Sequence, residues 1–178
     1  MTAELTHRIA TPADLPALSA LMDQAIGELQ KGFLTPEQIA SSRMIMGLDS
    51  QLIADGTYFM VHEDGVLAGC GGWSRRDTLY GGDHTPGREP RLLDPATEPA
   101  RVRAMYTSPA FARRGVGRLI LTLCEAAAKA EGFTRLELAA TLSGKPLYEA
   151  YGFEPIQAFE DDRGGVAVPL VRMGKAVV

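Results

Sequence analysis

The chain has 178 residues, and 22 acidic against 18 basic side chains give it a formal net charge of −4 at neutral pH. A hydrophobic content of 46% suits a folded domain and excludes intrinsic disorder, while the acidic balance argues against a dedicated nucleic-acid-binding protein. This length favours one domain, residues 1–178, which can bury enough surface to fold without disulfides or a structural metal.

Neither a secretory signal nor a membrane span is expected. Residues 1–7 have no apolar core, and no apolar run approaches the ~20 residues needed to cross a bilayer. The two cysteines, Cys70 and Cys124, form no C-x-x-C pair. We therefore expect a cytoplasmic protein in a reducing compartment, with neither membrane nor nucleic acid among its partners.

Two helices are predicted near the N-terminus, after a short strand around Ile9. The residues Thr11-Pro12-Ala13-Asp14 place Thr at the N-cap, Pro at N1 and an acid at N3, and apolar residues then recur with helical spacing over 15–29. Thr35-Pro36-Glu37-Gln38 repeats this start signal and adds a capping box. We assign Met46 to the second helix.

A hairpin is predicted next. Residues 58–63 and 66–73 read as strands, and the Asp64-Gly65 pair between them is a strong turn signal. Residues 77–100 contain four prolines and several glycines, so they form a long irregular loop insertion. Because such loops are uncommon in compact domains, this one is expected to be functional or mobile.

A strand over 101–107 and a helix over 116–130 flank a basic elbow. Val102, Ala104 and Tyr106 alternate with their neighbours, which predicts that these three share one face of the strand. The run from 101 to 118 holds five arginines and no acid, and Gly115 and Gly117 stand at the helix start. Unpaired N–H groups and the helix dipole favour an anion at such a point. The elbow therefore predicts a phosphate-bearing ligand.

Two familiar phosphate loops do not fit this elbow. The nucleoside-triphosphate loop needs G-K-[ST], but Gly117 is followed by Arg118 and Leu119. The dinucleotide fingerprint needs a third glycine where Ile120 stands. A strand over 136–140, a short helix around Tyr148 and a closing hairpin over 155–160 and 166–173 complete the chain.

The elbow and the Tyr148 helix together resemble the GNAT superfamily of acyl-CoA N-acyltransferases. Residues 105–109 lead into Ala112-Arg-Arg-Gly-Val-Gly117, which is similar to the family's Q/R-x-x-G-x-G/A motif, and Leu147-Tyr-Glu-Ala-Tyr-Gly-Phe153 matches L-Y-x-x-x-G-F. The resemblance implies an α+β fold with a mostly antiparallel sheet of about six to seven strands, a splayed parallel pair and about four flanking helices.

The resemblance also implies that acetyl-CoA is the cosubstrate and that no metal is needed. Main-chain groups of Met105, Tyr106 and Thr107 would bind the pantetheine arm. The pyrophosphate would be held by the elbow, that is, by Arg113, Arg114, Gly115, Val116, Gly117 and Arg118. The first motif position is Ala112 rather than Gln or Arg, which removes one side-chain contact that Arg113 or Arg114 can replace.

Tyr148 and Glu137 are the candidate catalytic residues. Tyr148 matches the family's tyrosine that protonates the departing thiolate; its alternative role is a core tyrosine. Glu137 stands between two leucines of a strand, so it leaves on the opposite face and is the candidate base for the amine. It can equally be a surface carboxylate, and no base is needed if the amine arrives neutral.

Trp73 is the candidate wall of the acceptor pocket, with the 77–100 loop as its lid; alternatively it covers the sheet. His84 is interpreted as a loop residue and Cys70 as a small strand residue rather than a nucleophile. No His/Cys/Asp cluster has metal-ligand spacing.

The predicted function is direct transfer of an acetyl group to a primary amine of a small molecule or peptide. The alternatives are a catalytically silent acyl-CoA sensor and a protein N-terminal or lysine acetyltransferase. The resemblance further implies that a homodimer can form. The identity of the acceptor stays open.

Overall fold

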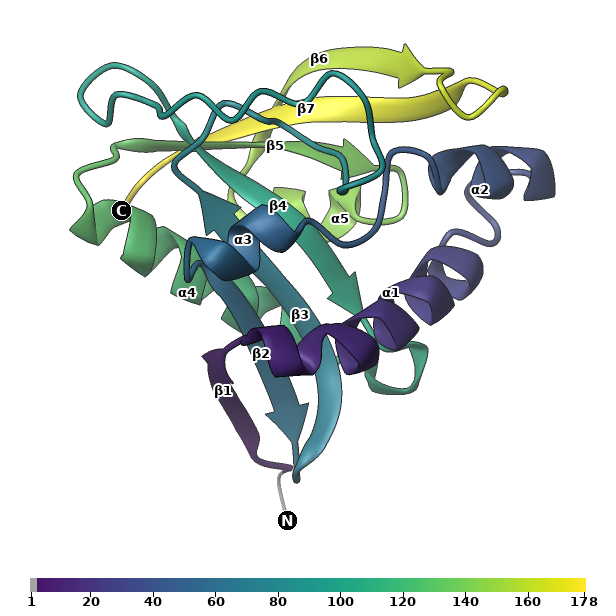
Figure 1. Ribbon diagram of the computed structural model, residues 1–178, viewed down its shortest axis with the longest axis horizontal. Coiled ribbons are helices and arrows are strands. Elements are labelled where there is room, and N and C mark those ends of the chain that lie inside the picture. Colours follow the sequence, from purple (N-terminus) through teal and green to yellow (C-terminus); the bar gives the residue numbers. More distant parts are fainter. Residues whose placement is uncertain (1–2) are drawn as a thin grey trace.

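One seven-stranded sheet runs through the computed structural model, which describes residues 3–178 (Figure 1). Its strands, in the spatial order β1-β2-β3-β4-β5-β7-β6, are β1 Leu5–Ile9, β2 Tyr58–Glu63, β3 Val66–Ser74, β4 Ala100–Thr107, β5 Arg135–Thr141, β7 Val168–Ala176 and β6 Glu154–Asp161. Neighbouring strands are antiparallel except β4 and β5, which are parallel. The mixed α/β architecture with a parallel pair confirms the predicted fold class.

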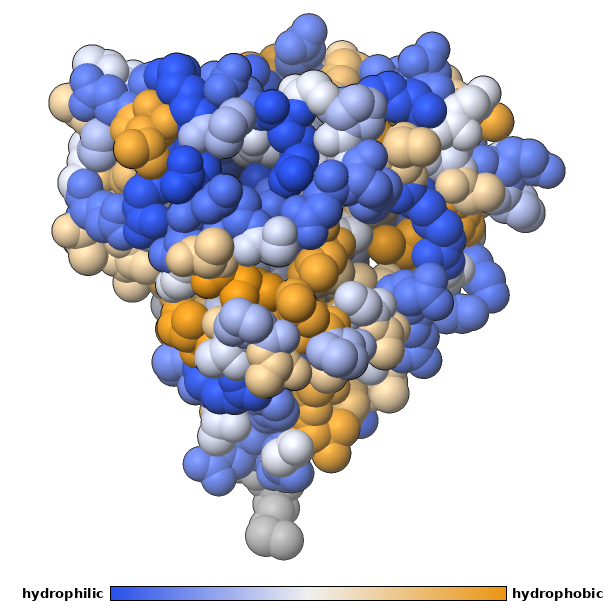
Figure 2. Space-filling view, viewed as in Figure 1, coloured by the Kyte–Doolittle hydropathy of each residue, from blue (hydrophilic) through white to orange (hydrophobic). Residues whose placement is uncertain are grey.

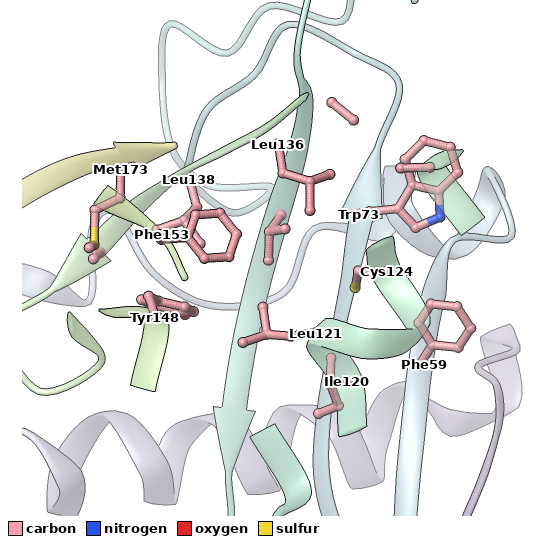
Figure 3. Close-up of a cluster of buried hydrophobic side chains, with 14 of the residues drawn as sticks. Phe59, Trp73, Ile120, Leu121, Cys124, Leu136, Leu138, Tyr148, Phe153 and Met173 are labelled. Atoms are coloured by element: carbon pink, nitrogen blue, oxygen red, sulfur yellow. The ribbon is translucent and has the colours of Figure 1, made fainter. Parts of the chain in front are cut away.

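Five α-helices cover the two faces of this sheet: α1 Leu15–Leu29, α2 Pro36–Ser42, α3 Ser50–Ala54, α4 Val116–Ala130 and α5 Lys145–Tyr151. One hydrophobic core joins α1 and α3 to the face seen in Figure 1, and a larger core joins α4 and α5 to the opposite face. Figure 3 shows Ile120, Leu121 and Cys124 of α4 inserted into that second core. None of these helices is long and apolar enough to cross a membrane, within residues 3–178.

The start signals of the N-terminal helices form as predicted, but their ends differ. Thr35 and Gln38 make the reciprocal capping box, with bonds of 2.9 and 3.2 Å. Helix α2 ends at Ser42, so the assignment of Met46 to it is wrong. The unpredicted helix α3 follows, because the Asp49 side chain accepts the Gln51 N–H at 3.0 Å and caps it. Three helices, rather than two, therefore precede β2.

Strand β4 contains a bulge that breaks its predicted alternation. Ala104 has φ +49°, and the register against β3 shifts between the Arg103 and Tyr106 pairs. As a result Val102 packs in the α4 core, whereas Tyr106 packs in the α1 core on the other face. The expectation that these side chains share one face is wrong, because one extra residue inverts the pattern.

Glycines of β3 bring α4 close to the sheet. A Cβ at Gly69 would lie 2.5 Å from Val116, and one at Gly71 would lie 2.8 Å from Ile120. Only residues without a side chain allow the first turn of α4 to approach so closely. This contact sets the start of α4 beside the end of β4.

The irregular 77–100 segment crosses the upper part of the molecule in Figure 1, and Figure 2 shows hydrophilic side chains gathered there. Ion pairs attach it to β4 and to the start of α3. Asp77 pairs with Arg101 of β4 at 2.8 Å, and Arg88 pairs with Asp49 at 2.8 Å. A bridge also joins Arg76 to Leu92. The segment is thus an anchored cover over this part of the sheet.

Candidate functional site

The elbow between β4 and α4 presents a row of main-chain donors. Arg113 has φ +63° and Gly115 has φ +84°, and these two left-handed residues turn the chain into α4. Six consecutive N–H groups, from Arg113 to Arg118, have no hydrogen-bond acceptor among residues 3–178. Such a row of main-chain donors, at the positive end of a helix dipole, is an arrangement that can bind an anion.

The two glycines of the elbow are explained by different structural constraints. A Cβ at Gly117 would lie 2.5 Å from the Leu147 side chain, so this glycine permits α4 to pack on α5. A Cβ at Gly115 would meet no atom within 4 Å. The positive φ therefore favours glycine at position 115, and the space above it is free for a ligand.

The elbow arginines are not all available to a ligand. Arg114 pairs with Glu63 at 2.8 Å, and Arg118 lies over the Tyr151 ring at 5.5 Å. Arg113 makes no ion pair with residues 3–178 and is exposed. Of the two predicted substitutes for the missing side chain at Ala112, Arg113 is thus the free one.

A cleft opens where β4 and β5 separate. The strands pair only through Ala100–Leu136 and Arg101–Glu137, and diverge toward their carboxyl ends. A cavity occupies the gap and extends onto the α1 face. Its lining consists of Ile45, Met46, Gly47, Leu79, Tyr80, Gly81, Val102, Arg103, Ala104, Met105, Tyr106, Leu138, Ala139, Thr141, Tyr148 and Leu170. The loop residues in this list come from 43–49 and from the 77–100 segment, which agrees with the expectation that the segment covers a pocket.

Tyr148 of α5 lies in this cavity. Its ring packs edge-on against Phe153, with centroids 5.9 Å apart, and Gly144 leaves room for the ring. Figure 3 shows the side chain beside Phe153 and Met173. The hydroxyl has no hydrogen-bond partner among residues 3–178, and burial raises the pKa of Tyr148, which keeps the phenol protonated. A phenol so placed can donate its proton to a group in the cavity.

The structure does not bring Glu137 to Tyr148. The Glu137 carboxylate accepts hydrogen bonds from Arg101 at 2.8 Å and from Arg172 at 2.6 Å. It stands where β4 and β5 are still paired, and it does not line the cavity. Because two guanidinium groups occupy the same carboxylate oxygen, the side chain is poorly placed to take a proton from an amine. This placement argues against Glu137 as a base. It gives the side chain a structural role at the point where β4 and β5 are paired.

Trp73 does not form a wall of the pocket. Its side chain is only 2% exposed and packs edge-on against Phe133, with ring centroids 6.0 Å apart. Figure 3 shows it in the hydrophobic core, on the far side of Cys124 from Tyr148. Arg75 lies over its outer surface at 5.1 Å from the ring centroid. The expected pocket wall is corrected to a core tryptophan that covers the sheet.

The three β4 residues expected along the coenzyme arm, Met105, Tyr106 and Thr107, lie beyond the last β4–β5 pair. Their main-chain groups on that side have no strand partner. The Tyr106 hydroxyl accepts the Gly47 N–H at 2.8 Å, and the Met105 side chain packs beside Gly71. The main chain of this stretch is therefore open to a ligand on the side that faces β5.

The remaining candidates have structural roles. Cys70 and Cys124 are buried and free, and burial raises the pKa of Cys70 to about 12, which disfavours a thiolate nucleophile. The His84 ring bonds the Arg43 carbonyl at 2.6 Å and lies outside the cavity. Within residues 3–178, no group of His, Cys, Asp and Glu side chains could hold a metal ion.

Sequence reasoning missed two side chains of the cavity, Tyr80 and Arg103. Tyr80 donates to Asp161 at 2.6 Å, and Arg103 pairs with Asp49 at 2.9 Å. Tyr80 lies in an irregular segment without periodicity. Arg103 appeared in the basic run of the elbow, although its side chain turns away from it.

Comparison with known proteins shows to which family this chain belongs. Residues 20–153 match the family described as "Acetyltransferase (GNAT) family". An uncharacterized N-acetyltransferase, YsnE of Bacillus subtilis (strain 168), is 26% identical over 121 residues, which cover 65% of this chain and 68% of that protein.

Solved structures with the same fold include two acetyltransferases. A GCN5-related N-acetyltransferase from Rhodopseudomonas palustris has a TM-score of 0.73 at 17% identity, over 99% of this chain and 98% of the other. YncA of Salmonella typhimurium, a putative acetyltransferase solved with its cofactor acetyl-CoA, has a TM-score of 0.63 at 18% identity, over 98% and 94%. The family match spans most of the chain, and the fold, the open β4–β5 cleft and the elbow agree with it: the protein belongs to the GNAT acetyltransferase family.

Proposed function

We propose that the protein transfers an acetyl group from acetyl-CoA directly to a primary amine of a small molecule. The observation that carries the proposal is the row of six unpartnered N–H groups, Arg113 to Arg118, beside a cleft that contains a protonated tyrosine. The row suits a diphosphate, the open edge of β4 suits the amides of a pantetheine arm, and Tyr148 suits the departing thiolate.

The elbow would bind the diphosphate through main-chain N–H groups, with Arg113 free to add a side-chain contact. The free edge of β4 beyond Arg101 would bind the arm, and one of its N–H groups would face the thioester oxygen. A preorganised donor at such an oxygen typically contributes about 10²–10³ in rate. The structural relative YncA, which was solved with acetyl-CoA, supports this choice of cosubstrate.

In the transfer, the amine nitrogen forms a bond to the acetyl carbon and the carbon–sulfur bond breaks. Tyr148 would give its proton to the leaving thiolate and regain one from solvent. No Asp or Glu side chain lines the cavity within the described part of the chain. The amine would therefore react in its neutral form and lose its proton to water, in agreement with the ion-paired state of Glu137.

The test measures acetyl-CoA binding by thermal shift and thiol release with a pool of primary amines. The proposal expects a raised Tm and release above the background without amine. A protein whose Tm does not respond to acetyl-CoA contradicts the site. Binding without any amine-dependent thiol release would instead support the silent sensor.

A further inference from the structure

Arg103 is the one charged side chain that lines the cavity, as far as residues 3–178 show. It belongs to β4, immediately before the bulge at Ala104, and it is 3% exposed. Its pKa is lowered because burial disfavours the charged form, although Asp49 offsets part of that effect. A charge this deeply buried is costly unless an anion compensates it.

Groups of the protein compensate the buried charge of Arg103 only in part. Only Nη2 of Arg103 donates, to Asp49 at 2.9 Å and to the Gly81 carbonyl. Asp49 is shared, because its other carboxylate oxygen pairs with Arg88 at 2.8 Å and accepts the Gln51 N–H at 3.0 Å. A further acid, Asp83, is exposed and lies 3.7 Å from Arg88.

Two donor atoms of Arg103 are left over. Nε and Nη1 have no acceptor among residues 3–178, and neither is among the fully buried polar atoms that lack a partner. Both therefore keep some accessible surface, and Arg103 is one of the residues that line the cavity. An almost completely buried cation thus directs free N–H groups into the same cavity that contains Tyr148.

The rest of the lining combines polar groups with aliphatic side chains, and within residues 3–178 it contains no carboxylate that could hold an ammonium group. Ile45, Met46, Leu79 and Leu170 surround the part of the cavity on the α1 face. A polycationic acceptor would gain no ion pair there and would be repelled by Arg103. A carboxylate would complete the unsatisfied guanidinium through a charge-assisted hydrogen bond.

We propose that the acceptor is an amino acid with an apolar side chain, and that Arg103 binds its carboxylate. This inference rests on the proposed acetyl transfer and adds the substrate class. The amino group is acetylated, the carboxylate meets Nε or Nη1 of Arg103, and the apolar side chain contacts the aliphatic lining.

The first test compares three matched acceptors for each of leucine, methionine and phenylalanine: the amino acid, its amide and its decarboxylated amine. We expect kcat/KM to be at least about tenfold higher for the amino acid of at least one series, since a hydrogen bond to a charged group is worth that much. The amide is a stringent comparison, because its amino group has a lower pKa than that of the amino acid. At a given pH more of the amide is neutral, so the amide would react faster if the carboxylate contributed nothing.

The second test uses Arg103→Gln, with Arg88→Gln as the matched control because Arg88 pairs with the same Asp49 but does not line the cavity. We expect the preference for the amino acid over the decarboxylated amine to disappear in R103Q, mainly through KM, and to persist in R88Q. A CoA-induced rise in Tm equal to that of wild type shows that the variant is folded.

If R103Q does not fold, the wild-type protein can still be tested. Calorimetry with each amino acid and its amide, in the presence of CoA, measures whether the protein recognises the carboxylate. Equal binding or equal turnover of amino acids and amides overturns the carboxylate assignment and leaves acetyl transfer intact. Failure of acetyl-CoA to bind overturns the proposed function separately.

Discussion

A single charge placed in the elbow tests the anion site with little change in structure. Gly115 has φ +84° and open space above it, so aspartate and asparagine, which both tolerate the left-handed region, can replace it without a clash. The two variants have the same size and the same backbone strain. They differ by one negative charge beside six unpartnered N–H groups.

The expected penalty follows from Coulomb's law. A carboxylate at position 115 would lie roughly 5 Å from a bound diphosphate, where a pair of unit charges interacts by about 0.8 kcal/mol in water and about 3 kcal/mol at an effective dielectric constant of 20. Because Gly115 is exposed, about 1 kcal/mol for each of two phosphate charges is appropriate. Gly115→Asp should therefore weaken CoA binding about 30-fold.

Thermal denaturation with CoA measures this loss. At a CoA concentration about 100 times the wild-type Kd, binding stabilises the protein by about 2.7 kcal/mol, and a 30-fold weaker site retains about 0.9 kcal/mol. For a chain of this size the rise in Tm should fall from about 8 °C to about 3 °C in G115D. G115N should keep a rise close to that of wild type. Equal shifts in G115D and G115N would refute the anion site.

Three further predictions test the cavity and the fold. Tyr148→Phe should lower kcat by about 10²-fold or more while the CoA-induced rise in Tm is kept, because the hydroxyl has no partner in the protein; an unchanged kcat would eliminate Tyr148 as the acid. Burial alone would raise the pKa of Asp161, but the hydrogen bonds from Arg163 outweigh it and lower this pKa to about 2. This carboxylate therefore contributes about 2 kcal/mol to the free energy of unfolding above pH 4, and the contribution is lost as the pH falls toward 2. Denaturant titrations at several pH values should show that the free energy of unfolding falls less steeply below pH 4 in Asp161→Asn than in wild type. Equally steep falls in the two proteins would contradict the pairing. Gly72→Ala should lower Tm by several degrees, because a Cβ there would overlap the carbonyl oxygen of Thr57, the residue before β2; a variant as stable as wild type would contradict this close packing.

The secondary structure around the proposed cofactor site could be predicted because its signals are local. The glycine pair, the helix start and the Tyr148 helix lie in short stretches of chain, and local chemistry sets their conformation. The Asp64-Gly65 turn formed for the same reason, with φ values of +49° and +83°. Glu137 and Trp73 were harder to place, because ion pairs to Arg101 and Arg172 and burial against Phe133 join residues that are distant in sequence.

The acceptor half depended on tertiary structure throughout. The bulge at Ala104 moves the side chains that follow it in β4 to the opposite face of the sheet, and no periodicity in the sequence of the strand indicates this change. Arg103 acquires its role only when Asp49 and Gly81, 54 and 22 residues away, close around one of its nitrogens. The sequence by itself determined most of the strands and helices, the capped start of α2 at Thr35, the Asp64-Gly65 turn and the glycine elbow before α4, since these depend on neighbours within a few residues. Tertiary structure alone decided which charges are neutralised and which face the cavity, because the energy of a buried charge depends on partners that only folding brings together.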